Sequence, residues 1–353
     1  MANIVLTGGG TAGHCIPNIA LIPYLKNNFE NIFYIGSKNG IEKQIVSKND
    51  IPYFSISCAK LNRSSIIKNL SIPFSLSKGI REAGKILDKI KPDIIFSKGG
   101  YVTLPVIFAA KKRKIPIISH ESDFTIGLAN KISAPYCKKV LTSFPETALT
   151  IKNGQFVGPP LKEQTSSKAK SLQNLGLSGK KPIIFVTGGS LGAQALNHSL
   201  RECLPYLLPN FDVLHACGKG NIEDNYSSNN YVQKEFISNM EEAYSIADVC
   251  VSRAGSNTVF EILNNKLPCL LIPLPKGASR GDQVLNAEYF QKKGMVNVLH
   301  QNVLTQKSLL SSIESTYYNR KNLIKQINSF PIENSCKKIS DELVYYANLK
   351  SEN

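Results

Sequence analysis

No two of the eight cysteines in this sequence form a Cys-x-x-Cys pair. Zinc knuckles and redox dithiols depend on that spacing, so neither is predicted. Several cysteines stand inside apolar runs, as Cys250 does in VCVS and Cys269 in PCLLIP. We therefore expect reduced cysteines that fill hydrophobic cores.

Long hydrophobic runs are missing as well. No segment approaches the ~18–20 apolar residues that span a bilayer. The N-terminal residues MANIVLTGGG read as a short strand that enters a glycine loop, without the basic and apolar regions of a signal peptide. We expect a cytoplasmic protein that touches a membrane at most peripherally.

The sequence also lacks an Asp-x-Asp pair and a cluster of His, Asp and Glu near the end of a strand. No metal site is therefore predicted, and we expect no cofactor. Helix N-termini would then supply the positive field that a metal ion gives to a diphosphate in other enzymes.

The net charge is +16, and the excess of Lys and Arg is larger in residues 1–150 than in the rest. A basic surface attracts nucleic acid, anionic lipid or small anionic substrates. No RNA- or DNA-binding motif accompanies the charge, so we expect no nucleic acid partner. Basic residues flank the apolar segment 65–76, and residues 111–114 are all basic. This pattern favours docking to an anionic membrane surface over a core helix with a solvated basic face.

Short apolar runs alternate with longer amphipathic stretches along the chain, which is typical of the β-α-β units of a parallel, doubly wound sheet. The pattern occurs twice. The strands expected in the two halves are residues 4–6, 32–35, 54–57, 94–97, 117–120 and 140–142, then 183–187, 212–216, 249–252, 270–272 and 296–299.

A polar stretch with two prolines, VGPPLKEQTSSKAKS, separates the two series of strands and suits a linker, so we place the boundary near Gly158. The prediction is an α/β protein of two Rossmann-like domains, residues 1–158 and 159–333. A C-terminal helix over 334–353 is expected to pack back on the first domain.

The two halves resemble each other. IVLTGGGTAGH near the N-terminus is similar to IIFVTGGSLGAQ in the second half, and DIIFSKGG (93–100) is similar to DVCVSRAG (248–255). The matches occur in the same order, which favours two similar domains that face a central cleft. That cleft is the expected active site.

The first glycine loop, Gly8–Gly13, follows a strand and enters a helix. Backbone N–H groups of such a loop, together with the positive end of the helix, attract an anionic group. The spacing also satisfies Gly-x-Gly-x-x-Gly. A dinucleotide site needs an acid at the end of the second strand, where this sequence reads Gly36-Ser37-Lys38, so nicotinamide binding is disfavoured.

His14 follows this loop, on the first turn of the expected helix. A neutral imidazole at a helix N-terminus can accept a proton as a general base. Hydrogen bonding to a substrate, or capping of the loop, is the alternative role, and both stay open.

Two loops of the second half have related features. Gly188–Ala193, again between strand and helix, can hold a diphosphate with backbone amides and the Ser190 hydroxyl. Ser252–Thr258 leads into a helix that carries Glu261, whose carboxylate can accept hydrogen bonds from a ribose diol. A merely structural turn and a surface glutamate are the alternatives.

Seven motifs carry a resemblance to a known family: GGGTAGH (8–14), KGGYVTLP (98–105), HESDFTIGLANK (120–131), VGPP (157–160), GGSLGAQ (188–194), SRAGSNTVFEI (252–262) and DQVLNA (282–287). Over nearly its whole length the sequence resembles the peptidoglycan N-acetylglucosaminyltransferases, which are GT-B glycosyltransferases. The resemblance implies inverting transfer of N-acetylglucosamine from UDP-GlcNAc to the MurNAc 4-hydroxyl of undecaprenyl-diphospho-MurNAc-pentapeptide (lipid I) during peptidoglycan synthesis. It also implies peripheral attachment to the cytoplasmic face of the cell membrane.

The resemblance implies that His14 is the catalytic residue. The residues implied to contact the acceptor and its diphosphate are Gly9, Gly10, Gly99, Gly100, Tyr101 and Lys162. Those implied to contact UDP-GlcNAc are Thr11, Ala12, Gly13, Asn130, Gly189, Ser190, Ile237, Glu261, Asp282 and Gln283. Lys162 departs from a frequent Arg of the family, Leu191 from a frequent Gln, and Asp282 from a frequent Gln or His.

The partners implied by the resemblance are lipid I, UDP-GlcNAc, an anionic membrane surface, and other proteins of cell-wall synthesis and division. Three alternative functions stay open. They are a UDP-GlcNAc 2-epimerase of the same architecture, an NAD(P)-dependent oxidoreductase, and a catalytically silent scaffold bound to the membrane. Release of UDP without a lipid acceptor would favour the epimerase.

Overall fold

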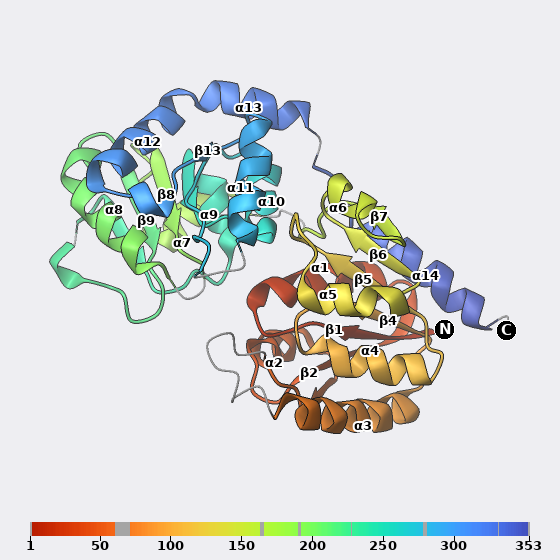
Figure 1. Ribbon diagram of the computed structural model, residues 1–353. Helices are drawn as coiled ribbons and strands as arrows, with labels where there is room; N and C mark the ends of the chain where they lie inside the picture. Colours follow the sequence, from red (N-terminus) through yellow and green to blue (C-terminus); the bar gives the residue numbers. More distant parts are fainter. Residues whose placement is uncertain are drawn as a thin grey trace. The chain divides into compact units, whose positions relative to one another are not determined.

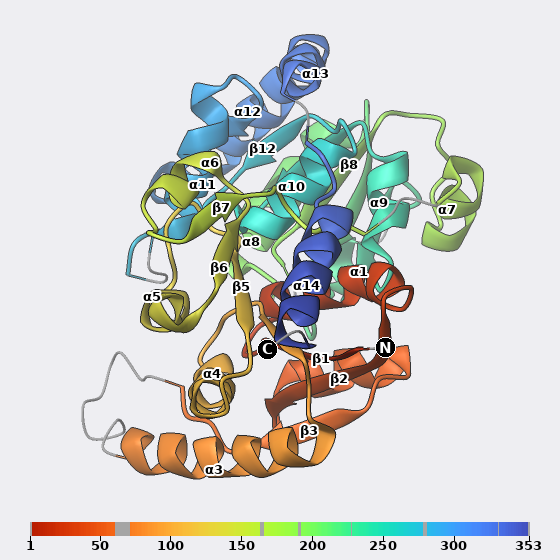
Figure 2. The same ribbon diagram turned by 90° about the vertical axis from the view of Figure 1, so that its right-hand side faces the viewer.

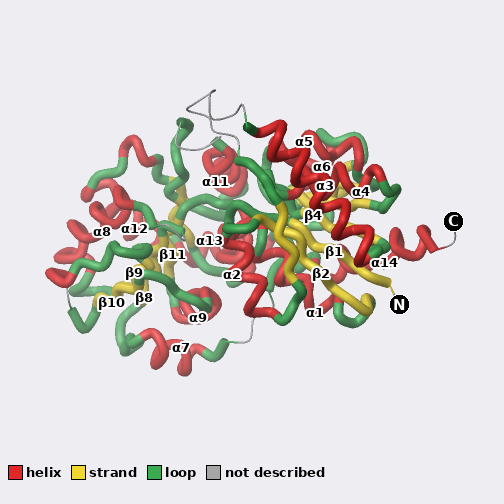
Figure 3. The backbone as a smooth tube through the Cα atoms, turned by 90° about the horizontal axis from the view of Figure 1, so that it is seen from below, coloured by secondary structure: helices red, strands yellow, loops and turns green. Residues whose placement is uncertain are grey.

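The computed structural model describes residues 2–60, 71–162, 166–189, 192–226, 228–277, 281–330 and 332–351. The chain divides into two compact units: residues 1–162 with 333–353, and residues 163–332 (Figure 1). Each unit contains one parallel sheet with helices on both faces (Figure 3). The expected α/β class is therefore confirmed for both units.

The first unit has a seven-stranded sheet of order β3-β2-β1-β4-β5-β6-β7. Its strands are β1 (Ala2–Thr7), β2 (Phe29–Ser37), β3 (Tyr53–Ile56), β4 (Ile94–Ser97), β5 (Ile117–Glu121), β6 (Lys139–Thr142) and β7 (Gly154–Phe156). Its helices are α1 (Ile16–Leu25), α2 (Ile41–Val46), α3 (Ile72–Ile90), α4 (Thr103–Lys112), α5 (Leu128–Ser133), α6 (Pro145–Leu149) and α14 (Cys336–Ser351), with short 3₁₀ turns at Ala12–His14, Ser47–Asn49 and Ala134–Tyr136. The strand order reverses between β1 and β4, so the loops after these strands meet at the topological switch point, where doubly wound sheets bind ligands.

Strand β1 separates two hydrophobic cores of the first unit. Ile4 and Leu6 point into one core, together with α1 and α14, whereas Val5 points into the other, together with α3 and α4. Successive side chains of a strand face opposite sides of the sheet, so a strand covered on both faces must be apolar throughout. This explains the uninterrupted apolar run at the start of the sequence.

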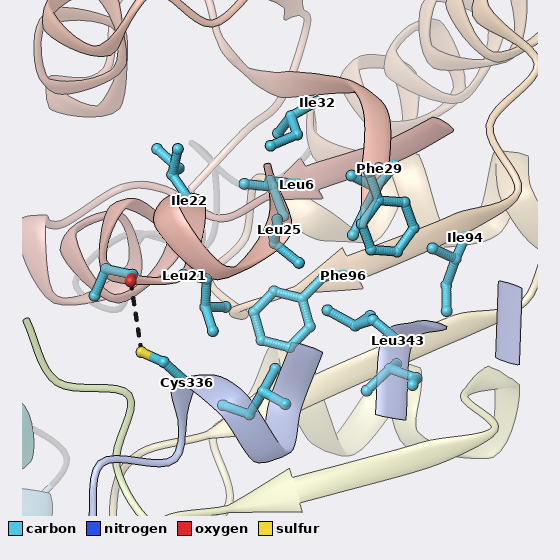
Figure 4. Close-up of a cluster of buried hydrophobic side chains, with 14 of the residues drawn as sticks. Leu6, Leu21, Ile22, Leu25, Phe29, Ile32, Ile94, Phe96, Cys336 and Leu343 are labelled. Atoms are coloured by element: carbon cyan, nitrogen blue, oxygen red, sulfur yellow. Dashed lines mark hydrogen bonds between the residues drawn. The ribbon is translucent and has the colours of Figure 1, made fainter. Parts of the chain in front are cut away.

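The C-terminal helix α14 belongs to the core of the first unit, where it packs against α1 (Figure 2). Cys336 and Leu343 of this helix are buried beside Leu21 and Phe96 (Figure 4). The Cys336 thiol donates a hydrogen bond to the Ala20 carbonyl oxygen at 3.5 Å. The chain thus returns from the second unit to complete the first.

The second unit has a six-stranded sheet of order β10-β9-β8-β11-β12-β13. Its strands are β8 (Ile183–Thr187), β9 (Asp212–Ala216), β10 (Tyr231–Lys234), β11 (Val249–Ser252), β12 (Cys269–Leu271) and β13 (Asn297–Val298). Its helices are α7 (Lys168–Leu175), α8 (Gln194–Leu207), α9 (Met240–Ile246), α10 (Ser256–Asn264), α11 (Asp282–Lys292), α12 (Gln306–Tyr318) and α13 (Arg320–Ser329), with 3₁₀ turns at Asp224–Tyr226 and Gln301–Val303. Here the strand order reverses between β8 and β11.

The internal similarity of the sequence corresponds to equivalent positions in the two sheets. The Asp93 carboxylate, just before β4, accepts a hydrogen bond from the Asn3 backbone N–H of β1 at 2.8 Å. The Asp248 carboxylate, just before β11, accepts one from the Ile183 backbone N–H of β8, also at 2.8 Å. Each aspartate fixes the two central strands of its sheet, on either side of the switch point.

Two strands were missing from the sequence-based expectation. They are β7 (Gly154–Phe156) and β10 (Tyr231–Lys234), which form the outer edges of their sheets. An edge strand has a neighbour on one side only and is short or partly polar, as GQF and YVQK are, so it lacks the continuous apolar run of a central strand.

All eight cysteines are free thiols, and all of them except the half-buried Cys58 are buried. The expectation that they fill hydrophobic cores is therefore confirmed for these seven. Among the residues that the structure describes, no helix is long and apolar enough to cross a bilayer.

Candidate active site

Two loops meet at the switch point of the first unit: Gly8–His14 after β1 and Lys98–Val102 after β4. Gly100 has a φ of +86°, which favours glycine. A Cβ added to Gly100 would collide with the Gly9 carbonyl oxygen and lie 3.4 Å from Nδ1 of His14. The predicted acceptor residues Gly9, Gly10, Gly99 and Gly100 are therefore brought together with His14.

His14 lies in the 3₁₀ turn Ala12–His14, and helix α1 begins only at Ile16. The expectation that His14 stands on the first turn of the helix was therefore wrong, because the chain forms a separate 3₁₀ turn before α1 begins. The imidazole is half-buried, and its Nδ1 lies 2.8 Å from the Thr11 hydroxyl oxygen. Thr11 is exposed and can orient the ring.

The ring of Tyr101 lies against the first glycine loop. Gly10 has a φ of +87°, and a Cβ added there would lie 2.5 Å from Cε1 of Tyr101. Burial raises the pKa of the half-buried Tyr101 phenol. Tyr101 therefore keeps its proton and can donate a hydrogen bond from the wall of this site.

Glu42 of helix α2 is a site residue that the sequence analysis missed. Its side chain is fully buried, and its carboxylate accepts hydrogen bonds from the Gly10 backbone N–H at 3.2 Å and the Ser37 backbone N–H at 3.0 Å. The Ser37 hydroxyl bonds to the same carboxylate. A Cβ on Gly9 would lie 2.6 Å from Cδ of Glu42, so the glycine loop packs closely around this carboxyl group.

Glu121 and Asn130 hold the loop that follows β5. The Glu121 carboxylate accepts hydrogen bonds from the Gly127 backbone N–H at 2.8 Å and from the Asn130 side-chain amide at 2.9 Å. Burial raises the pKa of Glu121. Asn130 is 4% exposed, and a Cβ on Gly99 would lie 2.9 Å from its Oδ1. The predicted donor residue Asn130 is thus placed beside the Lys98–Val102 loop.

Lys98 and His120 form a buried pair below these loops. Nζ of Lys98 lies 2.8 Å from Nδ1 of His120. Nε2 of His120 lies 3.1 Å from the Gly158 carbonyl oxygen. Burial, reinforced by the Lys98 charge, lowers the pKa of His120 well below its usual range, so the imidazole is neutral.

Lys162, a predicted acceptor residue, is exposed. It is the last residue of the first unit before the chain enters the second unit.

The second unit places its own glycine loop, between β8 and α8, at its switch point. Gly189 has a φ of +84° and Gly192 one of +74°. A Cβ added to Gly192 would collide with the Cys217 carbonyl oxygen, so the loop packs directly on the backbone that follows β9. The predicted diphosphate ligand Ser190, and Leu191, lie outside the described residues.

Glu261 lies on the second turn of α10, which follows β11. Its Oε2 accepts a hydrogen bond from the Tyr244 hydroxyl at 3.2 Å. Burial raises the pKa of Glu261 to about 7, partly offset by the Tyr244 hydrogen bond. Glu261 is half-buried, and a carboxyl group can accept more hydrogen bonds than the one from Tyr244. This is not the environment of an ordinary surface glutamate.

The remaining predicted donor residues lie on loops and helix starts of the same unit. Asp282 begins α11, and Oε1 of Gln283 accepts a hydrogen bond from the Leu274 backbone N–H at 3.0 Å. The buried Ile237 lies between β10 and α9. Asn286, which the sequence analysis did not single out, donates to the Ala254 carbonyl oxygen at 3.2 Å.

Helix α11 is therefore joined to two of the loops around the switch point, the one after β12 through Gln283 and the one after β11 through Asn286. The signal for Asn286 was its place in DQVLNA, one helical turn after Asp282.

Within the described ranges, no three or more His, Cys, Asp or Glu side chains are grouped so that they could hold a metal ion.

Two doubly wound units, each with a glycine loop at its switch point, form the GT-B architecture. Residues 4–142 match the model of the glycosyltransferase family 28 N-terminal domain, and residues 183–343 match that of its C-terminal domain. The chain belongs to glycosyltransferase family 28.

Curated relatives cover almost the whole chain. A protein of Clostridium botulinum (strain Alaska E43 / Type E3) is 46% identical over 94% of each chain, and one of Clostridium tetani is 44% identical over 99% of each. Both are named UDP-N-acetylglucosamine--N-acetylmuramyl-(pentapeptide) pyrophosphoryl-undecaprenol N-acetylglucosamine transferase.

Solved structures are similar over the same length. The crystal structure of Acinetobacter baumannii MurG has a TM-score of 0.76 at 25% identity and covers 97% of this chain and 99% of that one. A putative UDP-N-acetylglucosamine 2-epimerase from Listeria monocytogenes has a TM-score of 0.70 at 10% identity and covers 99% and 97%. The second likeness concerns the fold alone, so the epimerase alternative is not favoured.

Proposed function

We propose that this chain transfers N-acetylglucosamine from UDP-GlcNAc to the MurNAc 4-hydroxyl of undecaprenyl-diphospho-MurNAc-pentapeptide, forming lipid II. The observation that carries this proposal is the identity of 46% and 44% to two transferases named for that reaction, over 94% and 99% of each chain. The arrangement of side chains in each unit supports it.

The second unit supplies the donor site in this proposal. Glu261, whose Oε2 is bonded to the Tyr244 hydroxyl, accepts hydrogen bonds from the ribose hydroxyls. The Ile237 backbone contacts the uracil edge, and Asp282 and Gln283 contact the sugar. Helix α8 begins at Gln194, directly after the glycine loop. The positive N-terminal end of this helix faces the diphosphate in the proposal.

The first unit supplies the acceptor site and the base. O4 of MurNAc attacks C1 of GlcNAc, and its proton passes to Nε2 of His14. In this proposal Nδ1 of the same ring keeps its proton and donates a hydrogen bond to the Thr11 hydroxyl oxygen, which lies 2.8 Å away. The bond between C1 and the phosphate oxygen breaks with its electron pair remaining on UDP, and the anomeric centre inverts. Helix ends and loop amides stabilise the departing diphosphate without a metal ion or other cofactor.

The basic face of the first unit is proposed to lie against the cytoplasmic face of the cell membrane. Lys78, Arg81 and Lys85 are exposed along α3, and Phe74 at its start is 80% exposed. Each cation near an anionic leaflet contributes about 1 kcal/mol of attraction. Within the basic cluster 111–114, Arg113 is paired with Asp88 at 2.6 Å. The rest of the expected membrane segment, residues 65–70, lies outside the described residues.

Incubation of the purified chain with lipid I and radiolabelled UDP-GlcNAc tests the proposal. Label should enter the lipid fraction in proportion to enzyme, with one UDP released for each GlcNAc transferred. UDP release of equal rate without lipid I, or conversion of UDP-GlcNAc to its 2-epimer, would contradict it.

A further inference from the structure

The ammonium group of Lys98 is buried at the base of the loop Lys98–Val102, the acceptor loop. Lys98 is 2% exposed, and its Nζ is hydrogen-bonded to Nδ1 of His120 and to the Ser122 hydroxyl. A buried lysine is unfavourable unless it is paired, so a fold that contains one needs these partners. Electrostatic attraction to Glu121 and Asp123 raises the pKa of Lys98 and opposes part of the effect of burial. No role in the proposed reaction accounts for this residue.

Lys98 fixes the proton position on His120. An ammonium group donates hydrogen bonds and cannot accept them, so Nδ1 of His120 must be the acceptor. The proton of the neutral ring is then on Nε2, which donates to the Gly158 carbonyl oxygen at 3.1 Å. Both ends of the ring therefore specify the same tautomer.

At one end, this chain of hydrogen bonds reaches Gly158, which lies just before the polypeptide leaves the first unit. Gly158 has a φ of +95°, and the next residue, Pro159, accepts a hydrogen bond from the Ser335 backbone N–H at 3.1 Å. The Leu161 backbone N–H donates to Oδ1 of Asn334 at 3.3 Å. The chain leaves the first unit after residue 162 and returns at residue 333. The turn at Gly158 thus holds the outgoing and returning segments together.

At the other end, the chain of hydrogen bonds begins at Lys98, the first residue of the acceptor loop. The Lys98 backbone N–H donates to the Thr7 carbonyl oxygen at 2.8 Å, at the point where β1 gives way to the first glycine loop. The next two residues, Gly99 and Gly100, lie against Asn130 and Gly9. A shift of Lys98 would therefore move the loop that faces the acceptor.

We propose that Lys98 is a positioning residue that joins the acceptor loop, through His120 and Gly158, to the two segments connecting the units. In the transferase, this buried chain makes the loop and the interdomain connection one rigid block. That consequence rests on the proposed function, whereas the hydrogen-bond chain itself does not. Burial lowers the pKa of Lys98 to about 8, so the ammonium form predominates below that pH.

The first test is the ¹⁵N spectrum of the histidine side chains in the full-length wild-type chain. Substitution His215→Gln removes the signal of another fully buried imidazole and helps to assign His120. We expect a neutral ring with the proton on Nε2 at pH 7. A ring protonated on Nδ1, or a cationic ring, would overturn the proposal without any variant of Lys98.

The second test is hydrogen exchange in Lys98→Met, an uncharged side chain of similar length. Lys48→Met is the control, because Lys48 is exposed on the same unit. Segments 157–161 and 333–336 should exchange at least fivefold faster in Lys98→Met and at the wild-type rate in Lys48→Met. Wild-type exchange of both segments in folded Lys98→Met would refute the coupling.

Kinetics then separate this inference from the proposed function. In Lys98→Met, kcat/KM for lipid I should fall at least fivefold, while the affinity for UDP-GlcNAc stays within twofold of wild type. Lys98→Arg keeps a donor-only cation and should retain the wild-type tautomer of His120. If wild type transfers no GlcNAc, the proposed function fails, and the exchange and spectral results still decide the role of Lys98.

Discussion

The Glu42 carboxylate accepts a hydrogen bond from the Gly10 backbone N–H, with 3.2 Å between Oε2 and N. The amide group that a glycine loop usually offers to a phosphate thus already has an acceptor within the chain. We infer that this part of the loop shapes the site around His14, and that other amides approach the acceptor diphosphate.

Replacement of Glu42 should destabilise the first unit. In Glu42→Ala, the N–H groups of Gly10 and Ser37 lose their partner inside the protein, so we expect a loss of about 2–4 kcal/mol in the free energy of unfolding. Glu42→Gln keeps one acceptor oxygen and should lose about 1–2 kcal/mol. Urea denaturation measures both. The exposed Glu146→Ala should change stability by less than about 0.5 kcal/mol, and equal losses at both positions would contradict this role.

The central strands of both sheets were predictable because they are buried on both faces. Residues 94–97, 183–187, 212–216 and 249–252 were expected with the bounds that the structure shows. Burial on both faces requires a continuous apolar run, which the sequence displays directly. Of the four edge strands, β7 and β10 were missed because their short, partly polar segments carry no apolar run, whereas β3 and β13 follow apolar runs and were expected.

The site was predictable where one loop carries a whole motif, and not where its partners come from other elements. An acid was sought at the end of β2, where Gly36-Ser37-Lys38 offers none. Glu42 lies five residues after Ser37 and has a different role, because α2 turns its side chain back onto the Ser37 and Gly10 backbone N–H groups inside the protein. Likewise, no sequence spacing connects Tyr244 with Glu261, since their contact depends on the packing of α9 and α10.

Binding of UDP-GlcNAc should depend on the ionisation of Glu261, whose pKa is raised to about 7 by burial. A ribose diol donates its hydrogen bonds to a carboxylate, so binding favours the ionised form. As the pH falls below about 7, affinity should fall by up to tenfold for each unit, and above 7 it should level off. Calorimetric titration between pH 5.5 and 8.5 measures this, because the donor diphosphate is esterified at both ends and keeps its charge.

Glu261→Gln is the control for that titration. It should bind UDP-GlcNAc more weakly than wild type at pH 8, and its affinity should be nearly independent of pH. A wild-type affinity that is flat across the range would show that the Glu261 carboxylate does not contact the donor. An equal slope in Glu261→Gln would assign the titration to another group.

The hydroxyl of Thr11 should matter for turnover through the orientation of His14. Its oxygen lies 2.8 Å from Nδ1, so Thr11→Val frees the ring to rotate and to change tautomer. We expect kcat to fall about tenfold, against about 10²–10⁴-fold for His14→Ala if His14 is the base. Initial rates at saturating lipid I and UDP-GlcNAc measure both variants.

Thr150→Val is matched to Thr11→Val, because Thr150 is also exposed and its hydroxyl also makes a local hydrogen bond of 2.8 Å. It should leave kcat unchanged. In the double variant of Thr11 and His14, the Thr11 substitution should have no further effect, because the ring that it orients is gone. If His14→Ala alone retains kcat within threefold of wild type, the base must be another group.

The glycine loop of the second unit should tolerate no side chain at Gly192. Gly192 has a φ of +74°, which costs about 1–2 kcal/mol for an L-residue. A Cβ there would also collide with the Cys217 carbonyl oxygen, so the loop must move. For Gly192→Ala we expect a loss of about 2–4 kcal/mol in the free energy of unfolding and at least tenfold weaker UDP-GlcNAc binding.

Gly220 separates the effect of the backbone conformation from the effect of the collision. It has the same φ of +74° as Gly192, but nothing lies within 4 Å of an added Cβ. Gly220→Ala should therefore lose only the backbone contribution of about 1–2 kcal/mol and keep the affinity for UDP-GlcNAc within twofold. Urea denaturation and calorimetric titration of the two variants give both quantities. Both variants carry the same backbone cost, and only Gly192→Ala adds the collision with Cys217. Equal affinities would therefore mean that the position of the glycine loop before α8 does not control donor binding.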